Sequence, residues 1–261
     1  MPIINLGRRA VLGAALLALG GRARAEGVEV HVLTSGGLTA AYRILGPEFE
    51  KATGHRLITA QGASMGQAPD AIPQRLARNE PADVLLLAAN GLDALIATGK
   101  AVAGSRVDIA ESLIGLAVRS GAPRPDIGTM EGFRRTLLEA KSIAYSASAS
   151  GVYIEGEMYR RMGLEAELAP KSRKIMSERV GSVVARGEAE IGFQQMSELL
   201  PIQGIDVIGP IPRAIQQVTV FSAGIAANAR QPEAARALIA FLASPEAREV
   251  LRKTGVEPMG R

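Results

Sequence analysis

Three short segments rich in serine and glycine carry the clearest chemistry in this sequence. They are Ser35-Gly36-Gly37, the segment around Ser64, and Ser148-Ala149-Ser150-Gly151, and each stands between an expected strand and the start of an expected helix. A helix N-terminus offers free backbone N–H groups and a positive dipole end, glycine lets a ligand approach the backbone, and serine adds a hydroxyl donor. Serine and glycine are also ordinary capping and turn residues, so one such segment alone indicates little. Their recurrence in both halves of the chain predicts one shared site for a small anion.

A second pattern, Gly62-Ala63-Ser64-Met65-Gly66, matches the G-x-S-x-G turn that presents a nucleophilic serine in α/β-hydrolases. A secreted serine hydrolase is therefore the alternative function. That fold needs an acid and then a histidine after the serine, whereas the two histidines, His31 and His55, both precede Ser64. Structural roles are the simpler interpretation for both histidines, because one lies in an alternating strand pattern and the other follows a glycine that ends a helix. We predict a binding protein that is not an enzyme.

The composition leaves little material for metal or cofactor chemistry, and we predict neither. Cysteine and tryptophan are absent, aromatic residues make up 3% of the 261 residues, and the acidic residues have no metal-ligating spacing. Four arginines in the first 25 residues account for the formal net charge of +4, since removing them leaves 26 basic residues against 26 acidic ones. We therefore expect no nucleic-acid binding, and we expect a monomer.

Residues 1–25 predict a signal peptide. Arg8-Arg9 precede an apolar run from Ala10 to Leu19, and Ala23-Arg24-Ala25 forms an A-x-A cleavage site before Glu26. The apolar run is about half of the roughly 20 residues that a membrane-spanning helix needs, which makes a retained anchor the weaker interpretation. The paired arginines favour the twin-arginine export route, with the general secretory route left open. We expect a periplasmic protein.

Short apolar strands and longer helical patterns alternate along the chain and must position these segments. Expected strands cover 28–33, 56–60, 83–87, 112–119, 142–145, 190–193, 205–208 and 218–226, and expected helices cover 38–53, 72–79, 92–98, 130–140, 152–162, 178–186, 232–242 and 245–254. Gly46-Pro47 is expected to interrupt the first helix. The pattern predicts an α/β protein with mostly parallel sheets.

Two clusters rich in glycine and proline, at 121–126 and 209–212, divide the chain into lobes. We predict a first lobe from 26–115 and 217–261, with a second lobe over 116–216 inserted into it. The segments 112–120 and 212–222, where the chain crosses between the lobes, are the expected hinges.

The order and spacing of several short motifs resemble the molybdate-binding group of periplasmic solute-binding proteins, the receptors of ABC importers. The matching stretches span nearly the whole chain after residue 25 and are 32–39, 49–54, 62–64, 75–84, 150–153, 180–193 and 241–245. The resemblance implies a two-lobed type II periplasmic binding protein fold without a metal cofactor. It also implies that serine hydroxyls and backbone N–H groups hold an anion in the cleft between the lobes.

Carried over residue by residue, the resemblance places ligand-binding positions at Ser35, Gly36, Gly37, Ser64, Ser150, Gly151, Val180 and Gln195. Gln195 stands where the family has a tyrosine, and the family's first-loop serine corresponds to Gly37. An amide offers a donor and an acceptor whereas a phenol offers one hydroxyl, so a small organic acid and an inorganic oxyanion both remain open as the ligand. A carboxylate ligand usually pairs with arginine, and the nearest basic residues are Lys171 and Arg173. We expect the protein to capture a small anion and deliver it to a membrane ABC permease.

Overall fold

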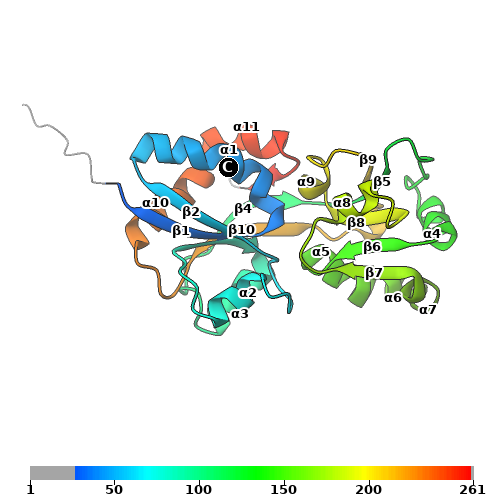
Figure 1. Ribbon diagram of the computed structural model, residues 1–261, viewed down its shortest axis with the longest axis horizontal. Coiled ribbons are helices and arrows are strands. Elements are labelled where there is room, and N and C mark those ends of the chain that lie inside the picture. Colours follow the sequence, from blue (N-terminus) through cyan, green and yellow to red (C-terminus); the bar gives the residue numbers. More distant parts are fainter. Residues whose placement is uncertain (1–26, 260–261) are drawn as a thin grey trace, which may run out of the picture.

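The computed structural model describes residues 27–259, which form two lobes side by side, each built on one β-sheet flanked by helices (Figure 1). The signal peptide predicted over 1–25 lies outside the described residues. Within 27–259, no helix combines the length and the apolar character needed to cross a membrane.

The sheet of the first lobe has six strands in the order β11-β4-β10-β3-β1-β2. In that order they are Glu257–Pro258, Val107–Ser112, Thr219–Ile225, Val84–Ala88, Glu29–Thr34 and Arg56–Gln61. β1 runs parallel to β2 and β3, whereas β10 runs antiparallel to β3 and β4. The prediction of a mostly parallel sheet is therefore wrong, because β10 brings the chain back from the second lobe in the opposite direction.

Helices cover both faces of this sheet (Figure 1). One face carries α1 (Gly36–Thr53), α10 (Pro232–Leu242) and α11 (Arg248–Lys253). The other face carries α2 (Ile72–Ala77) and α3 (Ala89–Ala97). A short 3-10 turn, Pro245–Ala247, precedes α11. Successive strand residues point to opposite faces, so Val32 and Leu86 join the core under α1 and α10 while Leu33 and Leu85 join the core under α2 and α3.

Helix α1 continues through Gly46-Pro47, contrary to the predicted interruption. Pro47 has no N–H to donate to the carbonyl of Arg43, but both residues are exposed, so solvent can satisfy that carbonyl. Leu45 and Phe49 on the opposite side of the helix are buried in the core of the first lobe. This packing outweighs the local preference for a break, and it holds the N-terminus of α1 at the boundary with the second lobe.

The sheet of the second lobe has five strands in the order β7-β6-β8-β5-β9. They are Ser172–Ile175, Ile143–Ser146, Ile191–Gln195, Ile114–Arg119 and Ile205–Pro210. This sheet is also mixed, because β6 is parallel to β7 and β8 whereas β5 is antiparallel to β8 and β9. Phe133 and Phe193 meet edge to face in its core, with ring centroids 6.1 Å apart.

Six α-helices surround the second sheet. They are α4 (Met130–Glu139), α5 (Ala149–Tyr153), α6 (Tyr159–Arg161), α7 (Glu165–Leu168), α8 (Val180–Ala185) and α9 (Met196–Leu199). A π-helical segment, Ile154–Met158, joins α5 to α6, and 3-10 turns occur at Ala169–Lys171 and Arg213–Ile215. The sequence patterns did not predict β4, β7, β11, α7 or α9, and the strand predicted over 112–119 is divided between β4 in one sheet and β5 in the other.

The chain passes between the sheets at Leu113 and again over 211–218, and these crossings overlap the two segments predicted as hinges, 112–120 and 212–222. The crossings are bonded to each other, since the Ile114 N–H donates to Gln216 Oε1 at 2.9 Å and Gln216 Nε2 donates to the Ile114 carbonyl at 3.0 Å. The second lobe is thus inserted into the first, as the predicted fold class requires. The exact lobe limits and the hinge role of the crossings stay predictions.

Candidate ligand-binding site

Four helices begin at the boundary between the lobes. Their N-cap residues are Ser35 for α1, Ser148 for α5, Arg179 for α8 and Gln195 for α9, and none of these side chains caps its own helix. The first N–H groups of a helix need partners from outside the helix. The side chain of Gln194 provides one at α8, where Oε1 accepts from the Val180 N–H at 2.9 Å. The boundary between the lobes is therefore rich in hydrogen-bond donors.

Two cavities that share Gly36, Ser148 and Glu198 occupy this boundary. The larger measures about 110 Å³ and is lined from the first lobe by Gly36, Gln61, Gly62, Ala63 and Asp70, and from the second by residues 146–148 and 175–179, Gln194 and Glu198. The smaller measures about 10 Å³ and is lined by Ser35, Gly36, Gly37, residues 148–150, Gln195, Glu198 and Phe221. Both lobes contribute to each cavity, so a ligand held there would contact both lobes.

Several hydrogen bonds join the lobes around these cavities. The Ser64 N–H donates to Ser148 Oγ at 3.2 Å, Ser177 Oγ donates to Asp70 Oδ1 at 3.1 Å, and Ser197 Oγ donates to the Gly37 carbonyl at 2.8 Å. Each bond depends on the two lobes lying close together. The structure therefore represents a closed arrangement of the lobes.

Five of the eight predicted binding residues line the smaller cavity: Ser35, Gly36, Gly37, Ser150 and Gln195. Gln195 Nε2 donates to Thr219 Oγ1 at 2.8 Å, while Gln195 Oε1 and Ser35 Oγ are buried without a hydrogen-bond partner among the described residues. A buried polar atom that lacks a partner costs about 1–3 kcal/mol. Both atoms are consequently suited to bind a ligand.

The other three predicted residues line neither cavity but support the walls. Ser64 Oγ accepts from the Ala88 N–H at 3.0 Å, and Val180 donates its N–H to Gln194. Gly151 packs so closely that a Cβ added there would lie 1.5 Å from the Ser146 carbonyl oxygen. These residues act on the position of the surrounding loops, so a ligand would not contact them directly in this arrangement.

The Ser64 pattern lacks the partner that a hydrolase needs. Ser64 is 0% exposed, and its hydroxyl is engaged with the Ala88 N–H. His31 lies within β1, and His55 Nδ1 accepts from the Val28 N–H at 3.2 Å. Within residues 27–259, no hydrogen bond connects either histidine to Ser64, so this serine has no base to activate it.

Glu198, a residue that the sequence analysis did not single out, places a buried carboxyl at both cavities. Gln194 Nε2 donates to Glu198 Oε1 at 2.9 Å, and a Cβ added at Gly36 would lie 1.8 Å from the same oxygen. Burial raises the pKa of Glu198 to about 7, against the opposing effects of the positive Arg179 and hydrogen bonds from Gln194 and Gln195. Near neutral pH this carboxyl is therefore divided between its protonated and ionised forms.

Arg179 brings a positive charge to the larger cavity. It is half-buried, and its side chain makes no hydrogen bond or ion pair within residues 27–259. The basic residues named from the sequence are engaged elsewhere: Lys171 Nζ donates to the carbonyls of Leu138 and Ala140 at 2.6 and 2.8 Å, and Arg173 pairs with Glu188 at 3.2 Å. Neither lines the cavity, so Arg179 replaces them as the cation of this site.

The places of Arg179 and Glu198 in the sequence offered a signal by which each residue could have been found. Arg179 directly precedes Val180, where the fourth ligand loop was predicted, but the helix predicted from 178 begins only at Val180. Gln194 and Glu198 stand four residues apart, a spacing that brings side chains together on a helix, and here the pair spans the junction of β8 and α9. The four-residue helix α9 is too short to give a periodic pattern.

An aconitate isomerase of Pseudomonas sp. is 48% identical to this chain over 249 residues, which are 95% of each protein. This relative is named as an enzyme and contradicts the prediction that the chain is not an enzyme. That prediction is wrong, because it rested on the missing base of the Ser64 pattern. The missing base argues only against serine-hydrolase chemistry. It does not bear on reactions that a buried carboxyl such as Glu198 could catalyse.

More distant relatives are binding proteins. The molybdate-binding protein ModA of Azotobacter vinelandii is 28% identical over 254 residues, 94% of each chain. The solved structure of the periplasmic molybdate-binding protein from Azotobacter vinelandii has a TM-score of 0.71 at 20% identity, covering 89% of this chain and 100% of that one, and therefore shares the fold. The model of the family described as bacterial extracellular solute-binding protein matches residues 30–257. The chain thus belongs to the bacterial extracellular solute-binding proteins, in their molybdate-binding-like group and with the type II periplasmic binding protein fold, as the resemblance predicted.

Proposed function

We propose that the cleft between the lobes binds aconitate, an alkene with three carboxylates, and interconverts its cis and trans isomers. The observation that carries the proposal is Arg179, whose side chain has no hydrogen bond or ion pair within residues 27–259, in the same cavity as a buried carboxyl, Glu198. The 48% identity to a protein named aconitate isomerase, over nearly the full length, supports the choice of substrate.

Arg179 supports a carboxylate as the bound group. A guanidinium pairs with a carboxylate through two parallel hydrogen bonds, and an arginine already paired with an acidic side chain could do so only after losing that partner. The starts of α1 and α5 and the Ser35 hydroxyl supply donors for the remaining carboxylates at the other side of the site. A ligand with several carboxylates uses donors from both lobes at once.

Glu198 argues against a simple inorganic oxyanion. An ionised carboxylate next to a molybdate or sulfate repels it, and a receptor for such an ion gains nothing from placing a carboxyl at its binding site. A carboxyl with a pKa of about 7 can instead donate a hydrogen bond when protonated and accept a proton when ionised. The arrangement suits a ligand on which chemistry is performed.

Delivery of the bound anion to an ABC permease is the second candidate function. The bonds that join the lobes, such as that of Ser177 with Asp70, favour it, since a ligand that contacts both lobes stabilises the closed form that a permease would recognise. Export to the periplasm by the predicted signal peptide, along the twin-arginine route, belongs to both candidates, as does a monomeric state.

Incubation of the purified protein with each aconitate isomer tests the proposal directly. Proton NMR should show conversion of either isomer toward the same equilibrium mixture. Both isomers should also raise the melting temperature, corresponding to about 2.7 kcal/mol at 100 times the dissociation constant, while molybdate and sulfate should not. Stabilisation by aconitate without any conversion would leave only the carrier function, and stabilisation by molybdate or sulfate alone would overturn the proposed substrate.

A further inference from the structure

Isomerisation at a carbon–carbon double bond requires that the π bond be broken for a time. In aconitate the double bond is flanked by a CH2 group, and each of the three carbons of this unit carries a carboxylate. Loss of a proton from the CH2 carbon delivers its C–H electron pair into a three-carbon allylic anion that the carboxylates help to delocalise. Return of a proton to the opposite end shifts the double bond and forms the other isomer. One proton leaves and one returns, so the step needs no oxidant or reductant, but it needs a residue that can hold the proton.

Glu198 has the position that such a residue requires. Its carboxyl contacts both cavities, and its side chain lies at the contact of the lobes, with Oε1 against the backbone of Gly36. Gly36 has no side chain, and any larger residue there would collide with the carboxyl oxygen at 1.8 Å. The carboxyl therefore lies directly at the loop where α1 presents its N-terminus to the cleft.

The neighbours of Glu198 hold it in one orientation. Gln194 lies four residues earlier, in β8, and donates through Nε2 to Glu198 Oε1 at 2.9 Å, while the other end of the same amide, its own Oε1, accepts from the Val180 N–H at 2.9 Å. Both ends of the Gln194 amide are used, so its orientation is determined. Ser197, the residue before Glu198 in α9, donates through Oγ to the Gly37 carbonyl at 2.8 Å, which fixes α9 against α1.

The charges around the cavity suit proton transfer. Arg179, Asp70 and Glu178 also line the larger cavity, but Glu178 is paired with Arg186 at 3.0 Å and Asp70 accepts from Ser177. Of the charged groups on the elements packed against α9, Arg179 is the one whose charge acts on Glu198. A cation at this position stabilises the negative charge that develops on the substrate carboxylates when the proton leaves.

From this arrangement we infer that Glu198 is a catalytic residue, which removes the proton from one carbon of the bound substrate and returns a proton to the other. The inference rests on the proposed function, because it assumes that aconitate binds in this cleft. Gln194 is a positioning residue, since it contacts Glu198 and not the reacting carbons.

Three variants of the full chain test the assignment. Glu198→Gln keeps the size and the hydrogen-bonding shape but cannot take up a proton, and Glu198→Asp keeps the acid on a shorter stem. Glu157→Gln is the matched control, because Glu157 is an exposed acid of the second lobe that pairs with Arg161 at 3.3 Å. The rate of interconversion is measured for each, together with the dissociation constant of trans-aconitate by titration calorimetry.

We expect Glu198→Gln to lower kcat by roughly 10²–10⁴-fold while the dissociation constant changes little, Glu198→Asp to retain part of the rate, and Glu157→Gln to match the unaltered protein. In D2O, the unaltered protein should introduce deuterium at the CH2 carbon of aconitate, and Glu198→Gln should not. Because proton removal needs the ionised carboxylate, kcat of the unaltered protein should fall as pH drops below about 7.

The outcomes separate the two proposals. If the unaltered protein converts aconitate and Glu198→Gln does so at the same rate with the same deuterium uptake, the assignment of Glu198 is overturned and the proposed function stands. If the unaltered protein neither binds nor converts aconitate, the proposed function fails, and the assignment fails with it. If Glu198→Gln does not fold, the deuterium uptake of the unaltered protein and the shifted pH profile expected of Glu198→Asp decide the question, and an unshifted profile overturns the assignment.

Discussion

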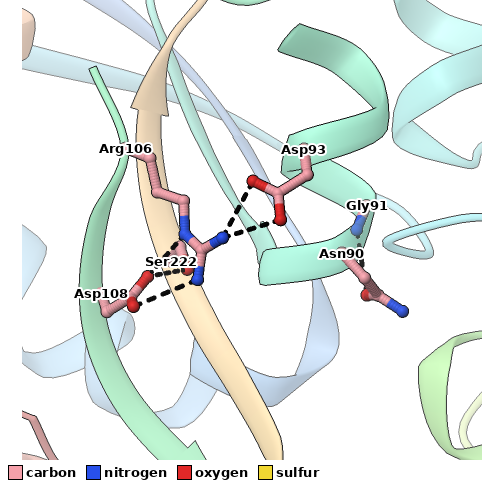
Figure 2. A network of polar contacts seen from close by, with 6 residues as sticks. All are labelled: Asn90, Gly91, Asp93, Arg106, Asp108 and Ser222. Carbon is pink, nitrogen blue, oxygen red and sulfur yellow. Dashed lines mark hydrogen bonds and ion pairs between the residues drawn. The ribbon is translucent and has the colours of Figure 1, made fainter. Parts of the chain in front are cut away.

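Arg106 and Arg179, both in the described part of the chain, occupy opposite electrostatic situations. Figure 2 shows the guanidinium of Arg106 between the carboxylates of Asp93 and Asp108. Arg106 Nη1 donates to both oxygens of Asp93 at 2.9 and 2.7 Å, and Nε and Nη2 donate to Asp108 at 2.7 and 3.1 Å. Arg179 lines the larger cavity between the lobes and has no such partner among residues 27–259.

The carboxyls beside these two arginines, Asp108 and Glu198, have pKa values shifted in opposite directions. Hydrogen bonds from Arg106, and one from Ser222 at 2.6 Å, hold the pKa of Asp108 below its usual range. Burial raises the pKa of Glu198 to about 7, although Arg179 acts against it. Charges that satisfy each other stabilise the first lobe by linking α3, β4 and β10. Charges that are left unsatisfied between the lobes do nothing for folding, and they are available to a ligand.

The pH dependence of stability should separate the two carboxyls most strongly. The pKa of Glu198 is raised above the ordinary glutamate value of 4.5, so its contribution is present at low pH and is lost as pH rises through about 7. The free energy of unfolding should therefore fall by an amount on the order of 3 kcal/mol at most between pH 5 and 8. Glu198→Gln should remove this fall, as measured by denaturant unfolding at several pH values. If the free energy of unfolding of Glu198→Gln fell with pH as steeply as that of the unaltered protein between pH 5 and 8, the burial of an ionisable Glu198 would be contradicted.

Asp108 should behave with the opposite sign. Its pKa is lowered, so its contribution is present above the ordinary carboxyl pKa and is lost as pH falls below it. Asp108→Asn should accordingly flatten the acid side of the profile and leave the range between pH 6 and 8 unchanged. The same unfolding experiment, extended to pH 3, measures both effects in one series.

Replacing each arginine by glutamine compares binding with stability. Arg179→Gln should weaken aconitate binding by roughly 10–100-fold, which corresponds to about 1.5–3 kcal/mol for a charged hydrogen bond, and should leave the melting temperature of the free protein unchanged. Arg106→Gln should lower the free energy of unfolding by about 1 kcal/mol, because its pairs with the half-exposed Asp93 and with Asp108 are screened by solvent, and should leave binding unchanged. Calorimetric titration and thermal melting of both variants measure the four quantities. A fall in melting temperature for Arg179→Gln would show that this residue is structural.

A matched pair of serines gives the smallest expected effect. Ser177 Oγ donates to Asp70 Oδ1 across the lobes at 3.1 Å, and Ser120 Oγ donates to Asp206 Oδ1 within the second lobe, also at 3.1 Å. Ser177→Ala should weaken ligand binding by about 0.5–1.5 kcal/mol, because the closed form loses one bond that the open form does not make. Ser120→Ala should not weaken it, since its bond is indifferent to closure. Equal dissociation constants for the two variants would mean that the Ser177 bond does not contribute to closure.

Much of the fold follows from local patterns. The strands and helices around Ser35 and Ser150 were predicted from apolar periodicity and from the glycine and serine loops between them, and the order of the motifs indicated the family. Strand direction was beyond such patterns, because here both sheets are covered by helices, and a strand buried on both faces reads as a continuous apolar run even where its neighbour is antiparallel. The continuation of α1 through Pro47 depended on packing of Leu45 and Phe49, which no local preference records.

The candidate site was predicted in part. The loops at Ser35 and Ser150 meet at one cavity because parallel strands end at the same edge of each sheet, a rule that applies before any coordinates are known. Arg179 and Glu198 escaped notice because each is one charged residue among many. Which of those charges is paired is decided by residues distant in the sequence, as Lys171 and Arg173 demonstrate by bonding to Leu138, Ala140 and Glu188.

The sequence by itself determined the α/β class, the family and the loops that offer donors to an anion, since backbone donors and turn residues act locally wherever they stand. Only the tertiary structure decided which carboxyl is buried and which arginine is left without a partner. The pKa of Glu198 depends on how much water the closed lobes exclude from it, and the availability of Arg179 depends on its side chain having no ion-pair partner within residues 27–259. Solvent exclusion and charge pairing are properties of the assembled lobes, and no segment of the chain carries them alone.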